Sequence, residues 1–162
     1  MRFNYSGYFY NLEKEAFNTV KNEFENNFQL SDNFTLFIHS VSAETSRKLN
    51  YKNFNKNYPT DVLTVPLYNN LIEIKKLDKN YNEVLGDLFL NTTLIKENAK
   101  RYDKKLVEEY QLVLLHGLLH LIGYSHNDQN KLRGMEEKIL KKEWKEKKRK
   151  TTQKTENRRE RK

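Results

Sequence analysis

The stretch LVLLHGLLHLIGYSH, residues 112–126, holds the strongest structural signal in this chain of 162 residues. From Leu112 to Ile122 it is apolar on nearly every side of a helix, which is typical of a central helix buried on all faces. We expect this helix to begin near Asp103, a good N-cap residue, and to be ended by Gly123. The sequence therefore predicts a fold built around one buried helix.

Three of the four histidines of the chain lie in this stretch, with the spacing of metal ligands. His116 and His120 stand at positions i and i+4, so on a helix they lie one turn apart on one face. Two imidazoles at that separation can both reach one ion at about 2.0–2.1 Å. Because Gly123 lets the chain turn back, His126 can arrive as the third ligand. The fourth position of a zinc-type ion is then left for water, as in catalytic sites.

Each histidine also has a structural alternative, that of a hydrogen-bonded core residue. Burying two imidazoles on an apolar helix costs roughly several kcal/mol unless their nitrogens find partners, and a shared ion is the simplest partner. We therefore predict one metal ion at His116, His120 and His126, and we keep the structural interpretation for His39, which stands alone in a strand pattern. Three histidines and a water also accept nickel, cobalt or copper.

The spacing resembles the extended zincin helix, H-E-x-x-H-x-x-G-x-x-H, in which the Glu after the first His is the general base. Gly117 occupies that position here and has no side chain. A bound ion can still lower the pKa of its water to about 7 and polarise a phosphoryl or carbonyl oxygen. The pattern favours hydrolysis, disfavours peptide hydrolysis by the zincin route, and leaves the catalytic residues unknown.

The remainder of the chain predicts strands and helices in an α+β order. Alternating or β-rich segments predict strands at 2–10, 34–41, 61–67, 71–77 and 84–91, and helical spacing predicts helices at 12–28, 42–52, 92–101 and from 127 onward. We expect one α+β domain in which a small mixed sheet packs against helices. Its central buried helix carries two of the three metal-binding histidines.

The formal net charge of +8 lies entirely near the C-terminus. Residues 141–162 hold 12 Lys/Arg and 4 Asp/Glu, whereas residues 1–140 hold equal numbers of each sign. We predict a folded domain over residues 1–143 and a basic, disordered tail over residues 144–162. Such a tail either binds phosphate groups without sequence preference or is a solvated segment with no partner.

Several absences also limit the function. The chain has no cysteine, which excludes disulfides and thiolate ligands, so a metal here has nitrogen and oxygen ligands. The first residues contain no apolar run like that of a signal peptide, and no run of about 18 apolar residues occurs. We expect a cytoplasmic protein with no membrane partner and no nucleotide cofactor.

Beyond these patterns, HGLLHLIGYSH at 116–126 closely resembles the H-G-x-L-H-L-x-G-Y-D-H signature of the YbeY family of bacterial single-metal endoribonucleases. Three further segments are similar to the family: PTDVLTVP at 59–66 to its P-T-D-V-L-S-F-P, LGDLFL at 85–90 to its L-G-D-I-x-I strand, and MEEKIL at 135–140 to its final helix. The resemblance covers roughly residues 35–143.

The resemblance implies a small α+β fold with one Zn²⁺ in a cleft, held by His116, His120 and His126. It also implies a metal-dependent endoribonuclease that cuts single-stranded RNA in 16S rRNA 3′-end maturation and ribosome quality control. Its partners would be ribosomal RNA and the small ribosomal subunit.

Two positions differ from the family pattern. Ser125 stands where the family usually has Asp, so a carboxylate that could orient a ligand is replaced by a hydroxyl. Phe54 stands where the family commonly has an arginine for RNA or phosphate. Lys52 and Lys56 are the candidate RNA-binding residues in its place, as point charges rather than a bidentate fork, and their alternative is ordinary solvated surface.

The resemblance also places Thr60 and Asp61 on a strand near the cleft, and Asp87 on a neighbouring strand. For both aspartates we favour a structural role, in which the carboxylate bonds nearby backbone amides. Two other functions stay open: a ribosome-associated assembly factor whose metal is structural, and a small metalloprotease whose base comes from outside the helix.

Removal of residues 145–162 is predicted to weaken RNA binding and to flatten its salt dependence. Each lost phosphate contact lowers the slope of log affinity against log salt by about 0.7–0.9. Fluorescence titrations of full-length and truncated protein with one RNA, at several salt concentrations, measure this slope. An unchanged slope would leave the tail without a part in binding.

Overall fold

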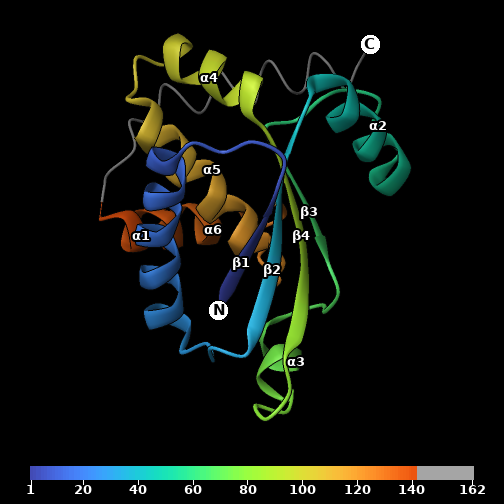
Figure 1. The fold of residues 1–162 in the computed structure, drawn as a ribbon, viewed down its shortest axis with the longest axis vertical. Coiled ribbons are helices and arrows are strands. Elements are labelled where there is room, and N and C mark those ends of the chain that lie inside the picture. The colour runs from blue at the N-terminus through green and yellow to red at the C-terminus, as the bar shows by residue number, and fades with distance from the viewer. Residues whose placement is uncertain (142–162) are drawn as a thin grey trace.

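Six helices and a four-stranded sheet make up residues 1–141, the part of the chain that this computed structural model describes (Figure 1). In chain order the elements are β1 (Arg2–Ser6), α1 (Asn11–Phe28), β2 (Phe34–Val41), α2 (Ala43–Phe54), β3 (Val62–Pro66), α3 (Leu71–Lys75), β4 (Glu83–Asn91), α4 (Thr92–Arg101), α5 (Leu106–Leu121) and α6 (Gln129–Leu140). The strands lie in the order β1-β2-β4-β3. The strands β1, β2 and β4 are parallel to one another, and β3 is antiparallel to β4, so the sheet is mixed.

Three of the helices lie on one face of the sheet. In Figure 1, α1, α5 and α6 stand beside one face, while α2 stands on the other side, near the start of β3. Alternate residues of the two central strands point into the helical layer because side chains along a strand alternate between its faces. These buried residues are Phe34, Leu36, Ile38, Leu88 and Leu90. The apolar stripe of α1 belongs to the same core, and α5 fills its centre.

The helix α5 meets the sheet at Gly117. A Cβ atom at this position would lie 2.7 Å from Cδ2 of Leu88 and 3.0 Å from Cγ2 of Val62, at or inside the closest approach of real side chains. The Thr64 hydroxyl donates a hydrogen bond to the carbonyl oxygen of Gly117 at 3.0 Å, which ties the helix to β3. Glycine at this position therefore allows the helix backbone to approach β3 and β4 closely.

The predicted α+β fold, its mixed sheet and the buried helix that carries His116 and His120 are confirmed. The first strand is shorter than predicted, because Gly7 takes a φ of 79° and turns the chain away after Ser6. The predicted tail at 144–162 lies outside the described residues, so it stays a prediction. Within residues 1–141, no helix is both long and apolar enough to span a membrane.

The strand predicted at 71–77 is wrong, because this segment forms the short helix α3. Asn70 caps the helix, and its side chain accepts a hydrogen bond from the backbone N–H of Glu73 at 3.0 Å. Ile74 is fully buried, on the same side as Leu71. In so short an apolar segment the alternating and helical patterns coincide, so the cap decides the outcome.

The predicted N-cap of the central helix is also wrong. Asp103 takes a left-handed φ of 52°, and its N–H donates to the carbonyl oxygen of Lys100 at 3.3 Å. The residue therefore closes the C-terminal end of α4, as a residue in this conformation commonly does. The helix α5 begins three residues later, after Lys105.

Replacing Gly117 with alanine is predicted to lower the free energy of unfolding by about 1–3 kcal/mol, because the new methyl group overpacks the contact with Leu88 and Val62. The matched control is Gly134→Ala on α6, where a Cβ atom meets nothing within 4 Å. That control should gain about 0.5–1 kcal/mol from helix propensity alone. Urea unfolding of both variants measures the difference, and equal gains would contradict the close approach.

Candidate metal centre

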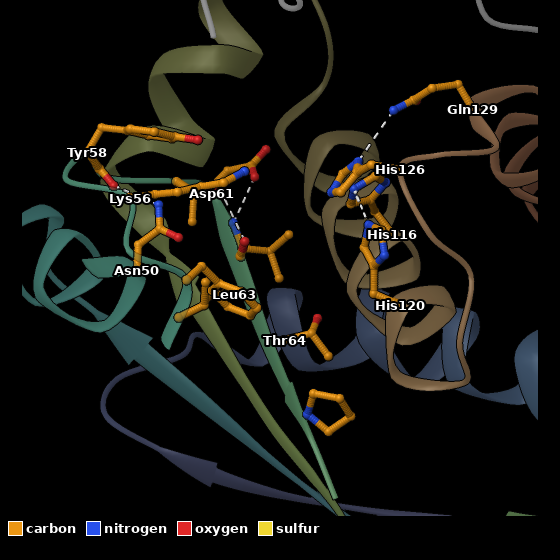
Figure 2. A pocket seen from close by; sticks show the side chains of 14 residues that line it. Asn50, Lys56, Tyr58, Asp61, Leu63, Thr64, His116, His120, His126 and Gln129 are labelled. Carbon is orange, nitrogen blue, oxygen red and sulfur yellow. Dashed lines mark hydrogen bonds between the residues drawn. The ribbon is translucent and has the colours of Figure 1, made fainter. Parts of the chain in front are cut away.

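Three histidines reach one point from α5 and the loop that follows it (Figure 2). His116 and His120 lie on successive turns of α5, facing β3 across a cavity. The helix ends at Leu121, and two residues later Gly123 turns the chain with a φ of 104°. A Cβ atom at Gly123 would lie 2.9 Å from the carbonyl oxygen of Asn69. This turn brings His126 back towards the helix.

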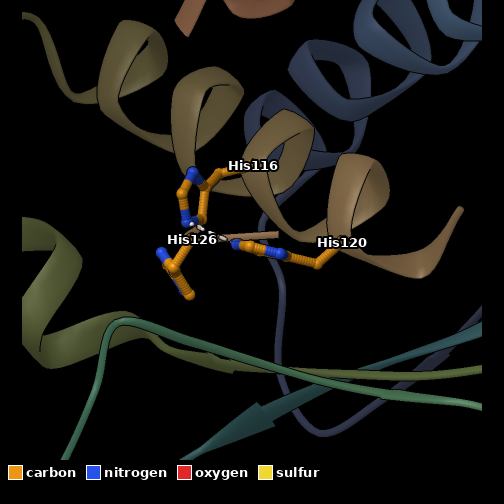
Figure 3. A group of neighbouring side chains, drawn as sticks. All are labelled: His116, His120 and His126. Carbon is orange, nitrogen blue, oxygen red and sulfur yellow. Dashed lines mark hydrogen bonds between the residues drawn. The ribbon is translucent and has the colours of Figure 1, made fainter. Parts of the chain in front are cut away.

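The three imidazole rings face one another closely enough to share an ion (Figure 3). The Nε2 atoms of His116 and His120 lie 3.0 Å apart. The ring of His126 has its centroid 4.3 Å from that of His120 and 5.5 Å from that of His116. Two nitrogens that are each about 2.0–2.1 Å from a tetrahedral ion are separated by about 3.3 Å, so the observed arrangement needs only a small adjustment.

The Nδ1 atoms of His116 and His120 make hydrogen bonds that decide which nitrogen of each ring faces the centre of the three-histidine group. Nδ1 of His116 lies 2.7 Å from Oε1 of Glu136, and Nδ1 of His120 lies 2.6 Å from the backbone carbonyl oxygen of Tyr124. A carbonyl oxygen or a carboxylate can only accept, so both Nδ1 atoms donate their hydrogen. Each Nε2 then presents a lone pair to the centre of the group, which is the arrangement of metal-binding histidines.

The electrostatics of the site keep His120 neutral. Burial, followed by the neighbouring His116 and His126, lowers the pKa of His120 to about 4. A single proton could join only two of the three imidazoles, whereas one ion can bind all three. The donor set therefore fits a divalent metal ion of the zinc type.

Glu136 is a site residue that the sequence analysis missed. The residue is buried, only 2% exposed, and its carboxylate holds His116 from α6. The signal for it was present in the sequence: Leu132, Glu136 and Ile139 follow one buried stripe of α6, and a glutamate in such a stripe needs a partner. Ser125, by contrast, accepts a hydrogen bond from the backbone N–H of Asn127 and shapes the loop.

The histidines form one wall of a cavity of about 650 Å³, and β3 with the loop before it forms the other (Figure 2). Its volume lies in the range of small-molecule and nucleotide sites. The lining residues besides the histidines are Asn50, Phe54, Lys56, Tyr58, Thr60, Asp61, Val62, Leu63, Thr64, Pro66 and Gln129.

Two buried polar side chains of α2 brace the loop opposite the histidines. The hydroxyl of Ser46 donates to the carbonyl oxygen of Thr60 at 2.9 Å and accepts from the N–H of Thr60 at 3.0 Å. The amide of Asn50 donates to the carbonyl oxygen of Tyr58 at 2.9 Å. These bonds fix the backbone of residues 58–60 against the helix.

Of the two candidate RNA-binding lysines, Lys56 lines the cavity and Lys52 lies exposed on the last turn of α2. Phe54 also lines the cavity, at the position where the family resemblance has arginine.

The two aspartates have different positions. Asp61 lines the cavity, where its Oδ1 accepts from the N–H of Val62 at 2.7 Å. Loss of hydration raises the pKa of Asp61, and the nearby His116 opposes that shift. Asp87 instead accepts from Nε2 of His39 at 2.7 Å, and neither residue of this pair is among those that line the cavity. His39 is therefore hydrogen-bonded within the sheet, in agreement with its structural interpretation.

The fold and the site define a small α+β protein with a three-histidine group that can hold a metal ion beside a cavity. Comparison with known proteins identifies its relatives. The family model described as Endoribonuclease YbeY matches residues 9–147. The chain therefore belongs to the endoribonuclease YbeY family.

Individual relatives agree with this assignment. The Endoribonuclease YbeY of Borreliella afzelii is 36% identical over 148 residues, which cover 88% of this chain and 89% of the relative. The Endoribonuclease YbeY of Buchnera aphidicola is 33% identical over 111 residues, covering 67% and 68%. The solution structure of TM1509 from Thermotoga maritima, 21% identical, covers 85% of this chain and 86% of its own with a TM-score of 0.51, and so shares the fold.

Loss of a histidine ligand is predicted to abolish metal binding, and loss of the carboxylate behind it to weaken metal binding. Protein purified without an affinity tag should hold about one equivalent of a transition metal, and His116→Ala should hold almost none. Glu136→Gln should weaken metal affinity by about 10–100-fold, because it removes the charge that holds His116. Mass spectrometry and chelator competition measure both effects. Glu137→Gln is the control, and a His116→Ala protein with full metal content would contradict the site.

Proposed function

We propose that this protein is a metal-dependent endoribonuclease that cuts single-stranded RNA, with one Zn²⁺ held by His116, His120 and His126. The observation that carries the proposal is the convergence of imidazole nitrogens on one wall of a cavity, in a chain of the endoribonuclease YbeY family. We assign its action to 16S rRNA 3′-end maturation and ribosome quality control in the cytoplasm. Its partners are then ribosomal RNA and the small ribosomal subunit.

The residues of the chain have distinct parts in this reaction. A bound ion supplies activation of water or polarisation of a phosphoryl oxygen. Glu136 and the carbonyl group of Tyr124 hold His116 and His120 in the orientation that presents Nε2. Asp61, the carboxyl group among the residues that line the cavity, is the candidate for carrying a proton, since its raised pKa makes the protonated form more accessible than in an exposed aspartate.

The shape of the site favours a single-stranded substrate. The histidines lie in a concave wall, opposite a braced loop, rather than on a flat face. A base-paired helix presents its backbone on a rigid cylinder, whereas an unpaired strand can bend its backbone and bases into a cavity. Lys56 in the lining and Lys52 on the last turn of α2 supply positive charge for the neighbouring phosphates.

One observation favours a second candidate, a ribosome assembly factor with a structural metal. The group joins the end of α5 to the loop before α6, and Glu136 already ties α6 to His116. An ion there would hold these elements together whether or not it acted on RNA. The metalloprotease alternative is disfavoured, because the chain belongs to the endoribonuclease YbeY family.

The His116→Ala and His120→Ala proteins are predicted to lose cleavage of single-stranded RNA to background, because each loses a metal ligand. His39→Gln, a change in a half-buried histidine outside the group, should keep cleavage within about twofold, because glutamine can still bond Asp87 and neither residue lines the cavity. Chelation should abolish wild-type cleavage and added zinc should restore it. Gel analysis of a labelled RNA measures the rates.

The same variants separate the two candidates. If His120→Ala folds, lacks metal, still co-sediments with small ribosomal subunits and still supports rRNA processing, the protein acts as an assembly factor. Equal cleavage by wild type and His116→Ala would exclude the metal-dependent nuclease.

A further inference from the structure

Phe54 is an exposed aromatic residue in the wall of the cavity. It is the last residue of α2, and 49% of its surface is exposed although it lines the cavity that the histidines share. Single apolar residues on a protein surface need no explanation, but this ring stands where a ligand would be bound. A ligand with a flat, apolar face would therefore fit against the Phe54 ring.

The backbone that carries this ring is held in place on both sides. Asn55 follows in the left-handed conformation with a φ of 57°, and its N–H donates to the carbonyl oxygen of Tyr51 at 2.9 Å. Beyond it, the bond from Asn50 to the carbonyl oxygen of Tyr58 draws the loop back onto α2. A ring on a fixed backbone loses little conformational entropy when a ligand binds against it.

The surroundings of Phe54 are cationic and polar. Lys52 and Lys56 stand two residues before and two residues after it, and Lys56 shares the cavity lining. Amide, hydroxyl and imidazole groups line much of the remaining wall, among them those of Asn50 and Thr64. An acyl chain would leave these groups without hydrogen-bond partners, whereas a nucleotide offers a flat base together with a phosphate for the lysines.

We propose that Phe54 stacks one unpaired base of the bound RNA and so positions a neighbouring phosphate at His116, His120 and His126. This inference rests on the proposed function and names the subsite by which the strand is held. Every base has a π-face, so stacking tolerates any sequence but needs a base that has left its duplex. Phe54 is then a positioning residue that contributes to the preference for single strands.

The first test compares aromatic substitutions on α2 in the full-length, metal-loaded protein. Stacking by one residue accounts for about 5- to 150-fold in affinity, so Phe54→Ala should weaken binding of a single-stranded RNA by a factor in that range. The loss should appear as a raised KM with kcat little changed, and Phe54→Trp should restore binding. Tyr51→Ala, which removes a 56% exposed aromatic residue of the same helix that does not line the cavity, should change affinity less than twofold.

The second test uses a set of RNAs that each lack one base, together with a double-mutant cycle. For the wild type, loss of one particular base should weaken binding as much as Phe54→Ala does. The Phe54→Ala protein should then be insensitive to that same loss. Fluorescence of 2-aminopurine at that position should be quenched by the wild type and recover in Phe54→Ala. Thermal unfolding and metal content of Phe54→Ala should match the wild type.

The outcomes distinguish this inference from the function on which it rests. Stacking by Phe54 would be overturned if Phe54→Ala and removal of the base each weaken binding and their two factors simply multiply. That result would hold even if the wild type cleaves RNA. Cleavage lost in His116→Ala together with unchanged KM in Phe54→Ala would likewise retain the nuclease and overturn the subsite. A non-additive cycle in a protein that binds RNA but does not cut it would retain the subsite and overturn the nuclease.

Discussion

The contact between α5 and the strands β3 and β4 at Gly117 determines where the groups of the site lie. A hydrogen in place of a side chain lets the helix backbone come close enough for Thr64 to bond its carbonyl oxygen. His116 directly precedes this contact and His120 follows it one turn after the first histidine, so both rings are held opposite β3. A larger residue at 117 would push the helix away from the sheet and separate the two walls of the cavity. The glycine that denies this helix a general base is thus the residue that allows the site to form.

Near this contact, hydrogen bonding and burial favour the same protonation state of the histidines. The acceptors behind His116 and His120 force the hydrogen onto Nδ1, and burial keeps His120 neutral, so both effects favour lone pairs that face the cavity. Glu136 in turn depends on His116, because a buried carboxylate left without its hydrogen-bond donor would destabilise the fold by about 1–3 kcal/mol or more. Fold stability and ligand orientation therefore depend on the same hydrogen bonds.

The successful predictions came from residue spacing within a short segment. The features that the sequence did not predict depend mostly on contacts between distant segments. The i, i+4 pair and the glycine after it predicted how His116, His120 and His126 come together, because helix geometry alone sets that arrangement. The packing of Glu136 against a histidine 20 residues earlier, and the bracing of Thr60 by Ser46, depend on tertiary structure that no local pattern contains. The misassigned segment at 71–77 failed for a different reason, since its apolar residues suit two periodicities and only the cap at Asn70 separates them.

The two walls of the cavity come from separate segments, and each is braced by its own neighbours. Hydrogen bonds from Ser46 and Asn50 support the loop between α2 and β3, while Glu136 and the turn at Gly123 support the histidines. We therefore expect substitutions at 52–58 to leave the geometry of the three histidines intact. The loop can therefore be altered without disturbing the histidines, which makes it the segment at which directed evolution could change what the cavity accepts.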